Sequence, residues 1–533
     1  MFADERRTRG RRLILLGSAL AAGIVGGSAF AGSGAEPVIP EGGTFRVNVT
    51  GTDFASLDPA INYDTDGAEL LYATCAKLVN YPDRPAPRGS VVQPEAASGM
   101  PTVSRDGRTY TFRVSSEFRF SNGAPVRAAD FEYTIRRVLD PRTHSPAVPF
   151  LRDLVAYRAS GDTLTLRLTR SAPDLLARLT MGFFCVVPEG TPIVARGLDT
   201  IPSAGPYYVA SRTPGVSVTL KRNPYYSGPR PHHVDEIDFA VFQDGYTSTR
   251  QIAAGQADYD VHSVTGDLRR ELALTYGVNG TRFFAHPMVA TDWIVLNTSR
   301  PLFRSASVRR AVAYAIDREA LVRAIGFLPG KVTQQILPPA MPGYRKVQLY
   351  PRRGDLQTAK RLMRNRRGTA VLYVSDNPFD NAVAVVLIRE LARINIDITV
   401  KPFYSAEYNR RIHRRGEPFD MTLGGWVADY LDPYDFINVV LSGDNITATN
   451  NQNLSHFDDP TFNGRMDAAA LLSGSRRYAA YAKLDADLVR EAAPIIPYAN
   501  NYRLDFVSKR TGCIVLAPGA ASGLDFAAVC LKS

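Results

Sequence analysis

Residues spaced like the catalytic groups of known enzymes are absent from this sequence. It has no GxSxG or SxxK pattern for a serine nucleophile, no HExxH zinc motif, and no Walker A or GxGxxG phosphate loop. Asp458 and Asp459 are neighbouring carboxylates, but adjacent surface acids are usually only solvated. These absences favour a protein that is not an enzyme. A hydrolase without a familiar motif is the alternative of a different class.

Four cysteines are the other residues with chemical potential: Cys75, Cys185, Cys513 and Cys530. Their even number favours two disulfides in an oxidising compartment, and three pairings are possible. None is spaced as a CxxC, and the seven histidines are dispersed except for His232-His233. We therefore expect no zinc site. No sequence motif indicates a cofactor.

The N-terminus carries an export signal. Five arginines precede Leu13, and residues 13–31 contain no charged residue. The segment ends in Ala29-Phe30-Ala31, a cleavage pattern of small residues, so residues 1–31 are predicted to be a signal peptide. Nineteen uncharged residues are also just long enough to span a bilayer, which leaves an uncleaved anchor as the alternative. Either way the remaining chain is expected outside the cytoplasmic membrane.

Length and composition indicate an ordinary globular chain of two or three domains. The sequence has 533 residues, of which 45% are hydrophobic and 22% charged. Single hydrophobic cores stop growing at about 250–300 residues. The formal net charge is +11, but the arginines occur as scattered pairs, and a solvated helix face explains the densest basic stretch, 360–367. We therefore expect no nucleic-acid binding.

The elements that must position any site differ between the two halves. In the first half, Phe45–Thr50 and Thr163–Leu168 alternate as half-buried strands do, and 68–78 is predicted to be a helix. In the second half, 370–374, 377–394 and 396–400 form a strand–helix–strand unit, the mark of a parallel sheet.

Helix ends and turns give further local predictions. Asp317 is expected to cap a helix that stops at Gly326. Short strands are expected at 118–120 and 419–423, the second followed by Gly424-Gly425-Trp426. The first half is therefore α+β and the second α/β.

Six stretches, in order over nearly the whole chain, resemble the solute-binding proteins of ABC-type peptide importers, family 5, the dipeptide- and oligopeptide-binding type. The residues of each stretch are similar to those of the family, and the stretches follow one another in the family's order. They are Leu57-Asp58-Pro59, 106–130 (beginning DGRTYTFR), Ala204-Gly-Pro-Tyr207 with 220–226, Ala254-Gly-Gln-Ala-Asp258, Leu296-Asn297 with 308–318, and 425–433 (GWVADYLDP).

This resemblance implies an α/β, two-lobed periplasmic-binding-protein-like fold of type II, with an extra α+β domain inserted in the first lobe. Two chain crossings between the lobes would form a hinge. The implied ranges are 40–63, 200–287 and 499–533 for lobe I, 64–199 for the inserted domain, and 288–498 for lobe II. These ranges place Cys75 with Cys185 and Cys513 with Cys530, so we expect the disulfides Cys75–Cys185 and Cys513–Cys530.

The resemblance also implies the function. A monomer would capture a peptide between its lobes and hand it to the permease subunits of an importer in the membrane. The family also includes binders of oligosaccharides, nickel complexes and other small solutes, so those ligands stay open. The sequence specifies neither the length of the ligand nor its affinity.

Four residues of the sixth stretch are the expected ligand contacts. Asp429 matches the family position whose carboxylate receives the α-ammonium of the peptide, and an enclosed ammonium needs such a partner. Gly425 and Val427 match positions whose backbone meets the peptide. Trp426 is expected to line the cleft, with core packing as the alternative. Many arginines could hold a ligand carboxylate, so that group stays open.

Overall fold

The computed structural model describes residues 39–532 except Thr52, Gln243, Ser263, Thr265 and 518–522. The expected signal segment, residues 1–31, lies outside the described residues. Within the described part, three larger sheets organise the chain: one of five strands, one of four and one of seven.

The five-stranded sheet has the order β11-β1-β10-β9-β8. Strand β1, second in this order, runs parallel to β10 and β11, whereas β8, β9 and β10 are antiparallel neighbours. Phe45, Val47 and Val49 alternate along β1 and are buried, as a strand with one face on a core requires. The strands are β1 (Thr44–Thr50), β8 (Tyr207–Thr213), β9 (Ser217–Arg222), β10 (Glu236–Phe242) and β11 (Tyr259–Asp260). The helices nearby in the chain are α1 (Thr65–Thr74), α4 (Gly245–Ala254) and α5 (Leu268–Tyr276).

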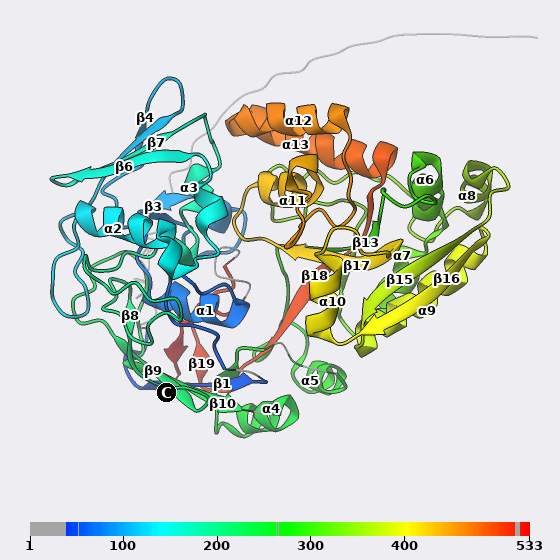
Figure 1. The fold of residues 1–533 in the computed structure, drawn as a ribbon. Helices are drawn as coiled ribbons and strands as arrows, with labels where there is room; N and C mark the ends of the chain where they lie inside the picture. The colour runs from blue at the N-terminus through cyan, green and yellow to red at the C-terminus, as the bar shows by residue number, and fades with distance from the viewer. Residues whose placement is uncertain are drawn as a thin grey trace, which may run out of the picture. The chain divides into compact units, whose positions relative to one another are not determined.

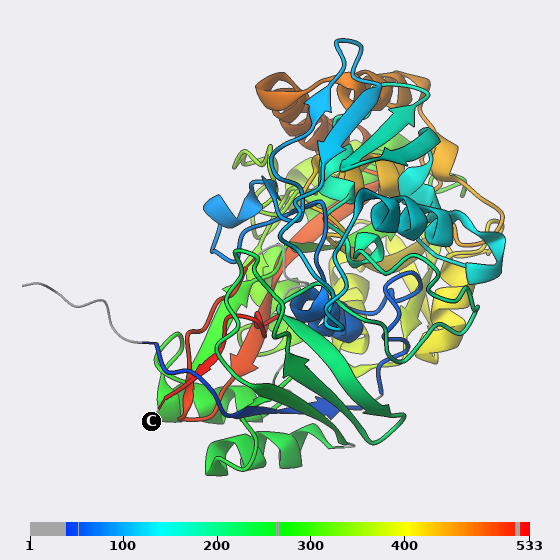
Figure 2. The ribbon, with the colours of Figure 1, turned by 90° about the vertical axis from the view of Figure 1, so that its left-hand side faces the viewer.

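A four-stranded antiparallel sheet with the order β4-β5-β7-β6 lies at the far end of the same lobe (Figures 1 and 2). Leu164, Leu166 and Leu168 point from β7 into its core, which helix α2 helps to close. The elements are β4 (Thr102–Val103), β5 (Thr109–Arg113), α2 (Ala128–Leu139), β6 (Leu154–Ser160) and β7 (Thr163–Leu168).

Both cysteine pairs expected from the domain ranges are bonded in the structure. Cys75, directly after α1, is bonded to Cys185, and their Cα atoms lie 5.1 Å apart. Cys513 is bonded to Cys530, with Cα atoms 5.3 Å apart, beside the small sheet of β19 (Thr511–Gly512) and β20 (Cys530–Leu531). The first bridge therefore ties α1 to the segment that ends the inserted sheet region.

The second lobe is built on most of the seven-stranded sheet, in which β12-β18-β13-β17-β15-β16 are neighbours and β14 pairs with β18, whereas β12 and the C-terminal end of β18 pack with α4 and α5. Parallel strands β15 and β16 are joined through α9, as the strand–helix–strand pattern predicts. The strands are β12 (Phe283–Pro287), β13 (Ala290–Leu296), β14 (Gly330–Val332), β15 (Gly368–Ser375), β16 (Ile396–Phe403), β17 (Met421–Val427) and β18 (Ile495–Phe506). The helices are α6 (Ala306–Ala315), α7 (Arg318–Ile325), α8 (Leu356–Met363), α9 (Pro378–Ala392), α10 (Ser405–Ile412), α11 (Pro433–Leu441), α12 (Pro460–Leu471) and α13 (Gly474–Asp487).

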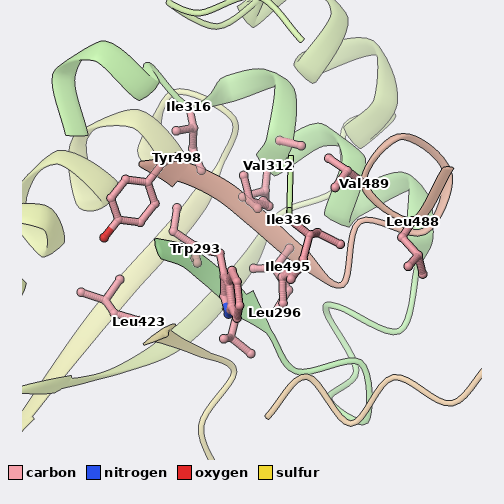
Figure 3. Packing of buried hydrophobic residues seen from close by; sticks show 14 of the residues in the cluster. Trp293, Leu296, Val312, Ile316, Ile336, Leu423, Leu488, Val489, Ile495 and Tyr498 are labelled. Atoms are coloured by element: carbon pink, nitrogen blue, oxygen red, sulfur yellow. The ribbon is translucent and has the colours of Figure 1, made fainter. Parts of the chain in front are cut away.

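The core of this lobe surrounds Trp293, which is 3% exposed (Figure 3). Val312 and Ile316 from α6 and its C-terminal end pack there together with Ile495 from β18. Burial of large apolar side chains of this kind contributes about 1.5–3 kcal/mol each. The sheet that carries the candidate site is therefore held on a packed apolar layer.

Two chain crossings connect the lobes, and they lie side by side. The first crossing lies between β12 and β13, and the second lies within β18. Strand β12 pairs with the C-terminal part of β18, and β13 pairs with its N-terminal part. At the junction, the backbone N of Met288 donates to the carbonyl of Asn501 at 2.8 Å. Figure 1 shows β18 running from beside β17 towards β1. The fold is thus α/β and two-lobed.

Several local predictions need correction. The first helix ends at Thr74 rather than at residue 78, and the chain is extended from Cys75 onward. Residues 118–120 form only an isolated bridge between Arg119 and Pro125, because the turn at 121–123 closes too soon for a strand ladder. The strand expected at 419–423 continues to Val427, since both glycines pair with β13.

Candidate functional site

A cavity of about 540 Å³ lies between the segment preceding α1 and the segment following β17. Its wall combines residues of both lobes. The first lobe and its inserted region contribute Tyr63, Asp64, Tyr72, Lys77, Thr180 and Phe183 among others, and the second contributes Val289, Val427, Ala428, Asp429 and Leu431. A cavity of this volume is within the range that binds small molecules, about 300–1,000 Å³.

Asp429 is the acid of this wall that comes from the second lobe. It follows the last residues of β17, and the hydroxyl of Tyr63 lies 2.9 Å from its Oδ1 and 3.0 Å from its Oδ2. Burial raises the pKa of Asp429 to about 6, although hydrogen bonds with Tyr63 and Asp435 lower it. The carboxylate therefore has a partner in the first lobe but no ion pair within the described residues.

Asp435 is hydrogen-bonded to the backbone of Asp429 and helps to fix its position. It lies in the first turn of α11, is fully buried, and its Oδ2 accepts hydrogen bonds from the backbone N of Asp429 at 2.9 Å and from Trp426 Nε1 at 3.2 Å. Burial, and then the charge of Asp429, raise the pKa of Asp435 well above its ordinary value. Because Oδ1 has no donor in the described structure, the protonated acid is the form that this arrangement favours.

The sequence explains why the segment before α11 is fixed. Asp432 caps the helix through a hydrogen bond from the backbone N of Tyr434 at 2.9 Å, and Pro433 occupies the first helical position. Arg477 donates to both oxygens of Asp432 at 2.9 and 2.6 Å. These contacts anchor one end of the segment that carries Asp429.

Residues immediately after Asp429 clamp the two lobes together. Tyr430 is 2% exposed, sits in the apolar core of the inserted sheet region, and contacts Phe150 edge-to-face with ring centroids 6.1 Å apart. Its hydroxyl donates to Asp174 Oδ2 at 3.4 Å. Conversely, Tyr81 comes from the inserted region but packs in the core of the second lobe. Its hydroxyl accepts a hydrogen bond from the backbone N of Leu431 at 3.1 Å. The structure is therefore a closed form.

Lys77 brings a cation to the same cavity. Its side chain is 1% exposed, its Nζ lies 4.9 Å from the centre of the Tyr72 ring, and it forms no ion pair within the described residues. Burial lowers the pKa of Lys77 to about 8, against the raising effect of Glu95. The cavity thus contains a carboxylate and a lysine amine.

A second cavity of about 490 Å³ adjoins the first, and Tyr63 lines both. Gly425 and Trp426 form part of its wall, together with Asp292 from β13 and Asp380 from α9. A Cβ atom at position 425 would stand 2.6 Å from Asp292 Oδ1. Glycine at this position therefore gives the Asp292 carboxylate room against the sheet.

The chain matches the model of the bacterial extracellular solute-binding proteins, family 5, over residues 91–448. That is more than half of its length. The chain belongs to this family. Proteins of family 5 are extracytoplasmic solute-binding proteins. In the part of this family 5 protein that the structure describes, no helix is both long and apolar enough to cross a membrane.

Known proteins resemble this family 5 chain over most of its length. The oligopeptide-binding protein OppA of Bacillus subtilis is 24% identical over 431 residues, which cover 74% of this chain and 77% of OppA. Heme-binding protein A of Haemophilus influenzae is 25% identical over 465 residues, 78% of this chain and 80% of the relative. The solved structure of clavulanic acid biosynthesis oligopeptide binding protein 2 superposes with a TM-score of 0.84 at 25% identity, covering 93% and 96% of the two chains.

The four residues expected at the ligand divide between the two cavities. Asp429 and Val427 line the first, whereas Gly425 and Trp426 line the second. Trp426 is only half-buried and donates to Asp435 as well as packing on the core. The four residues are therefore brought together along the end of β17, on either side of Tyr63.

Sequence reasoning missed several residues of these walls. Tyr63 stands four residues after the Leu57-Asp58-Pro59 stretch, so that stretch pointed to its neighbourhood but not to its contact with Asp429. Asp292 lies inside a strand, where an acid facing a cavity looks like any solvated strand residue. Asp435 has one local signal, its place three residues after the helix cap Asp432.

Proposed function

We propose that this protein captures a peptide in the closed cleft between its lobes and delivers it to an ABC importer without altering it. The α-ammonium of the peptide would sit at Asp429. One observation carries this proposal: a carboxylate that forms no ion pair within the described residues lines a cavity of ligand size at the contact between two lobes. The relative OppA is named for binding oligopeptides, which supports the same ligand class.

The chemistry of the wall agrees with a peptide. An enclosed ammonium loses its hydration and needs a carboxylate to offset that loss. Lys77 offers a cation of the kind that a terminal carboxylate needs, and apolar residues such as Leu71, Met181 and Phe183 line the space around these polar groups. A few polar groups in a mostly apolar cavity fix the orientation of a ligand without demanding one side-chain sequence.

The domain boundaries follow the same proposal. We assign 40–63, 200–287 and 499–533 to lobe I, 64–199 to the inserted domain, and 288–498 to lobe II. The packing of β12 and the end of β18 with α4 and α5 supports a boundary near residue 288.

Ligand identity is tested first by mass spectrometry of small molecules released from the purified, denatured protein. Calorimetry with a released peptide, or with members of a tripeptide library, then compares the wild type with Asp429→Ala. Removing one partner of a buried pair costs about 3–5 kcal/mol, but water entry reduces this, so we expect at least a tenfold loss, about 1.4 kcal/mol. Asp397→Ala, an exposed acid on β16, is the matched control and should bind as the wild type does.

N-acetylation of the peptide completes a double-mutant cycle. Acetylation should weaken binding to the wild type about as much as Asp429→Ala does, and the two changes together should cost less than their sum because both remove one interaction. Full-affinity binding by folded Asp429→Ala would contradict the assignment. The ligand would then be a sugar, a nickel complex or another solute held by different groups. Peptides recovered intact after long incubation would support binding without turnover.

A further inference from the structure

The second cavity has an excess of negative charge. Asp292 and Asp380 are its acidic wall residues, and no lysine or arginine is among the residues that line it. Neither carboxylate forms an ion pair within the described part of the chain. The imidazole in the wall belongs to His413, whose pKa is lowered by burial. Two acids therefore line one cavity whose described wall residues include no lysine or arginine.

The hydrogen-bond donors around the two acids are few and uncharged. Asp292 Oδ1 accepts from Asn501 Nδ2 at 2.9 Å, and Asp380 Oδ2 accepts from the backbone N of Ser375 at 3.0 Å. Burial raises the pKa of Asp292 to about 6 and that of Asp380 also upward, and the charge of Asp380 adds to the rise at Asp292. Each carboxylate therefore keeps acceptor capacity that no described protein group uses.

Tyr498 provides an independent sign of a ligand group. The residue is 4% exposed, and within the described residues its hydroxyl forms no hydrogen bond. It lies near both acids, whose charges contribute, after burial, to a strong rise in the pKa of Tyr498. Figure 3 shows its ring projecting from β18 with the hydroxyl directed away from the packed side chains of Val312 and Ile336. A hydroxyl on the cavity wall that no described protein group binds can form its hydrogen bond with a polar group of a ligand or with water.

Folding alone does not explain a charged residue at position 292. Asparagine has nearly the same shape, would keep an oxygen for Asn501, and would remove the repulsion from Asp380. The fold even places glycine at position 425 to make room for Asp292. A destabilising charge that the surrounding sheet accommodates in this way is typical of a binding site.

We propose that the second cavity is a subsite for a cationic group of the ligand, an ammonium or guanidinium, held by Asp292, Asp380 and the Tyr498 hydroxyl. The inference rests on the proposed peptide function and gives it a preferred substrate class: peptides with a lysine or arginine side chain. Since Tyr63 lines both cavities, a peptide whose amino terminus sits at Asp429 would pass a neighbouring side chain over Tyr63 into the subsite.

The test uses matched tripeptides in which lysine, or norleucine, which has the same carbon chain without the ammonium group, stands at one of the three positions and alanine at the other two. For wild-type protein, calorimetry should give at least tenfold tighter binding of the best lysine peptide than of its norleucine match. D292N/D380N should remove this preference, and Tyr498→Phe should reduce it. Asp429→Ala should weaken both peptides of a pair equally, and Asp397→Asn should leave all affinities unchanged.

A second readout separates binding from structure. D292N should raise the midpoint of thermal unfolding of the ligand-free protein, because it removes an unfavourable buried charge, while it weakens the lysine peptide. A loss of stability together with a loss of binding would mean that Asp292 is structural and would overturn the proposal.

Cadaverine and agmatine distinguish failure of the subsite from failure of the peptide proposal. Asp429-dependent peptide binding without a lysine preference overturns the subsite alone. If no peptide binds but these amines bind to the wild type and not to D292N/D380N, the peptide proposal fails and the cation subsite stands. Binding of neither class overturns both.

Discussion

The hydroxyl of Tyr63 lies within 3.0 Å of both carboxylate oxygens of Asp429, across 366 residues of sequence and from the opposite lobe. In the closed form this hydroxyl occupies the donor position that a ligand ammonium would take or share. At the proposed ammonium site, ligand affinity would therefore reflect an exchange: an ammonium contact to Asp429 would be gained while the neutral hydrogen bond from Tyr63 is rearranged.

The pH dependence of binding follows from Asp429. Its pKa is raised to about 6 by burial, so the carboxylate is lost as the pH falls through that value. The α-amino group of a peptide loses its proton above about pH 8. We expect affinity to be greatest near pH 7, to fall up to about tenfold for each unit below pH 6, and to fall again in alkali. Calorimetry from pH 4.5 to 9 with trialanine, which has no second cation, measures this; a flat acid limb would remove Asp429 from the site.

Tyr63→Phe should shift the acid limb, the fall of affinity at low pH, to higher pH. The Tyr63 hydroxyl lowers the pKa of Asp429 by hydrogen bonding to its charged form, and without it the carboxyl should protonate at a higher pH. We expect the midpoint of the acid limb to rise by about 0.5–1 pH unit. At pH 7.5 the affinity should change much less than at pH 6. An unshifted midpoint in a folded variant would show that the hydroxyl does not control Asp429.

Asp435 should tolerate asparagine but not alanine. The oxygen of an asparagine can still accept from Trp426 Nε1 and from the backbone N of Asp429, whereas Asp435→Ala leaves both buried donors unsatisfied. We expect Asp435→Ala to lower the free energy of unfolding by about 1–3 kcal/mol for each donor that water cannot reach. Asp435→Asn keeps an acceptor for both donors and should not show this loss.

The raised pKa of Asp435 also determines how the stability of Asp435→Asn, relative to the wild type, changes with pH. Since its pKa is raised in the folded protein, stability from the protonated acid is present at low pH and is lost as pH rises through the folded pKa. Asp435→Asn should therefore gain stability relative to the wild type as pH increases. Urea unfolding followed by tryptophan fluorescence at pH 5 and pH 8 checks the difference; a relative loss at pH 8 would contradict it.

The two disulfides should contribute unequally. Cys75 and Cys185 are separated by 110 residues and Cys513 and Cys530 by 17. In the chain-entropy model a loop of 100 residues gives about 4.7 kcal/mol and one of 15 residues about 3 kcal/mol. We expect C75A/C185A to lower the free energy of unfolding more than C513A/C530A. Guanidinium unfolding of both variants measures this, with the reduced wild type as reference; the reverse order would contradict the model.

Local signals in the sequence predict local structure well and long-range contacts poorly. Asp317 and Gly326 mark the two ends of α7 as expected, and the alternation of Thr163–Leu168 matches β7. The strand expected at 419–423 stops short of Gly424 and Gly425, but both glycines pair with β13, and this pairing overrides the weak strand propensity of glycine.

In the candidate site, too, the sequence predicts local features but not long-range contacts. The stretch 425–433 pointed to the region of Asp429, because its residue types carry the resemblance to the family. The contacts that define the cavities, Tyr63 with Asp429 and Asp292 beside Gly425, join residues more than 100 positions apart. Nothing in the local sequence of either partner encodes such a pairing, since the first contact depends on how the two lobes meet and the second on the register of β13 with β17.

The neighbouring crossings β12–β13 and β18 have a consequence for how the protein moves. Two hydrogen-bonded strands that share one junction, with Met288 bonded to Asn501, bend together and resist independent displacement. We therefore expect the lobes to separate mainly by bending and twisting of this ribbon. The distance between one pair of labelled positions across the cleft should report this bending, and single-molecule measurement of that distance would test whether open and closed molecules coexist.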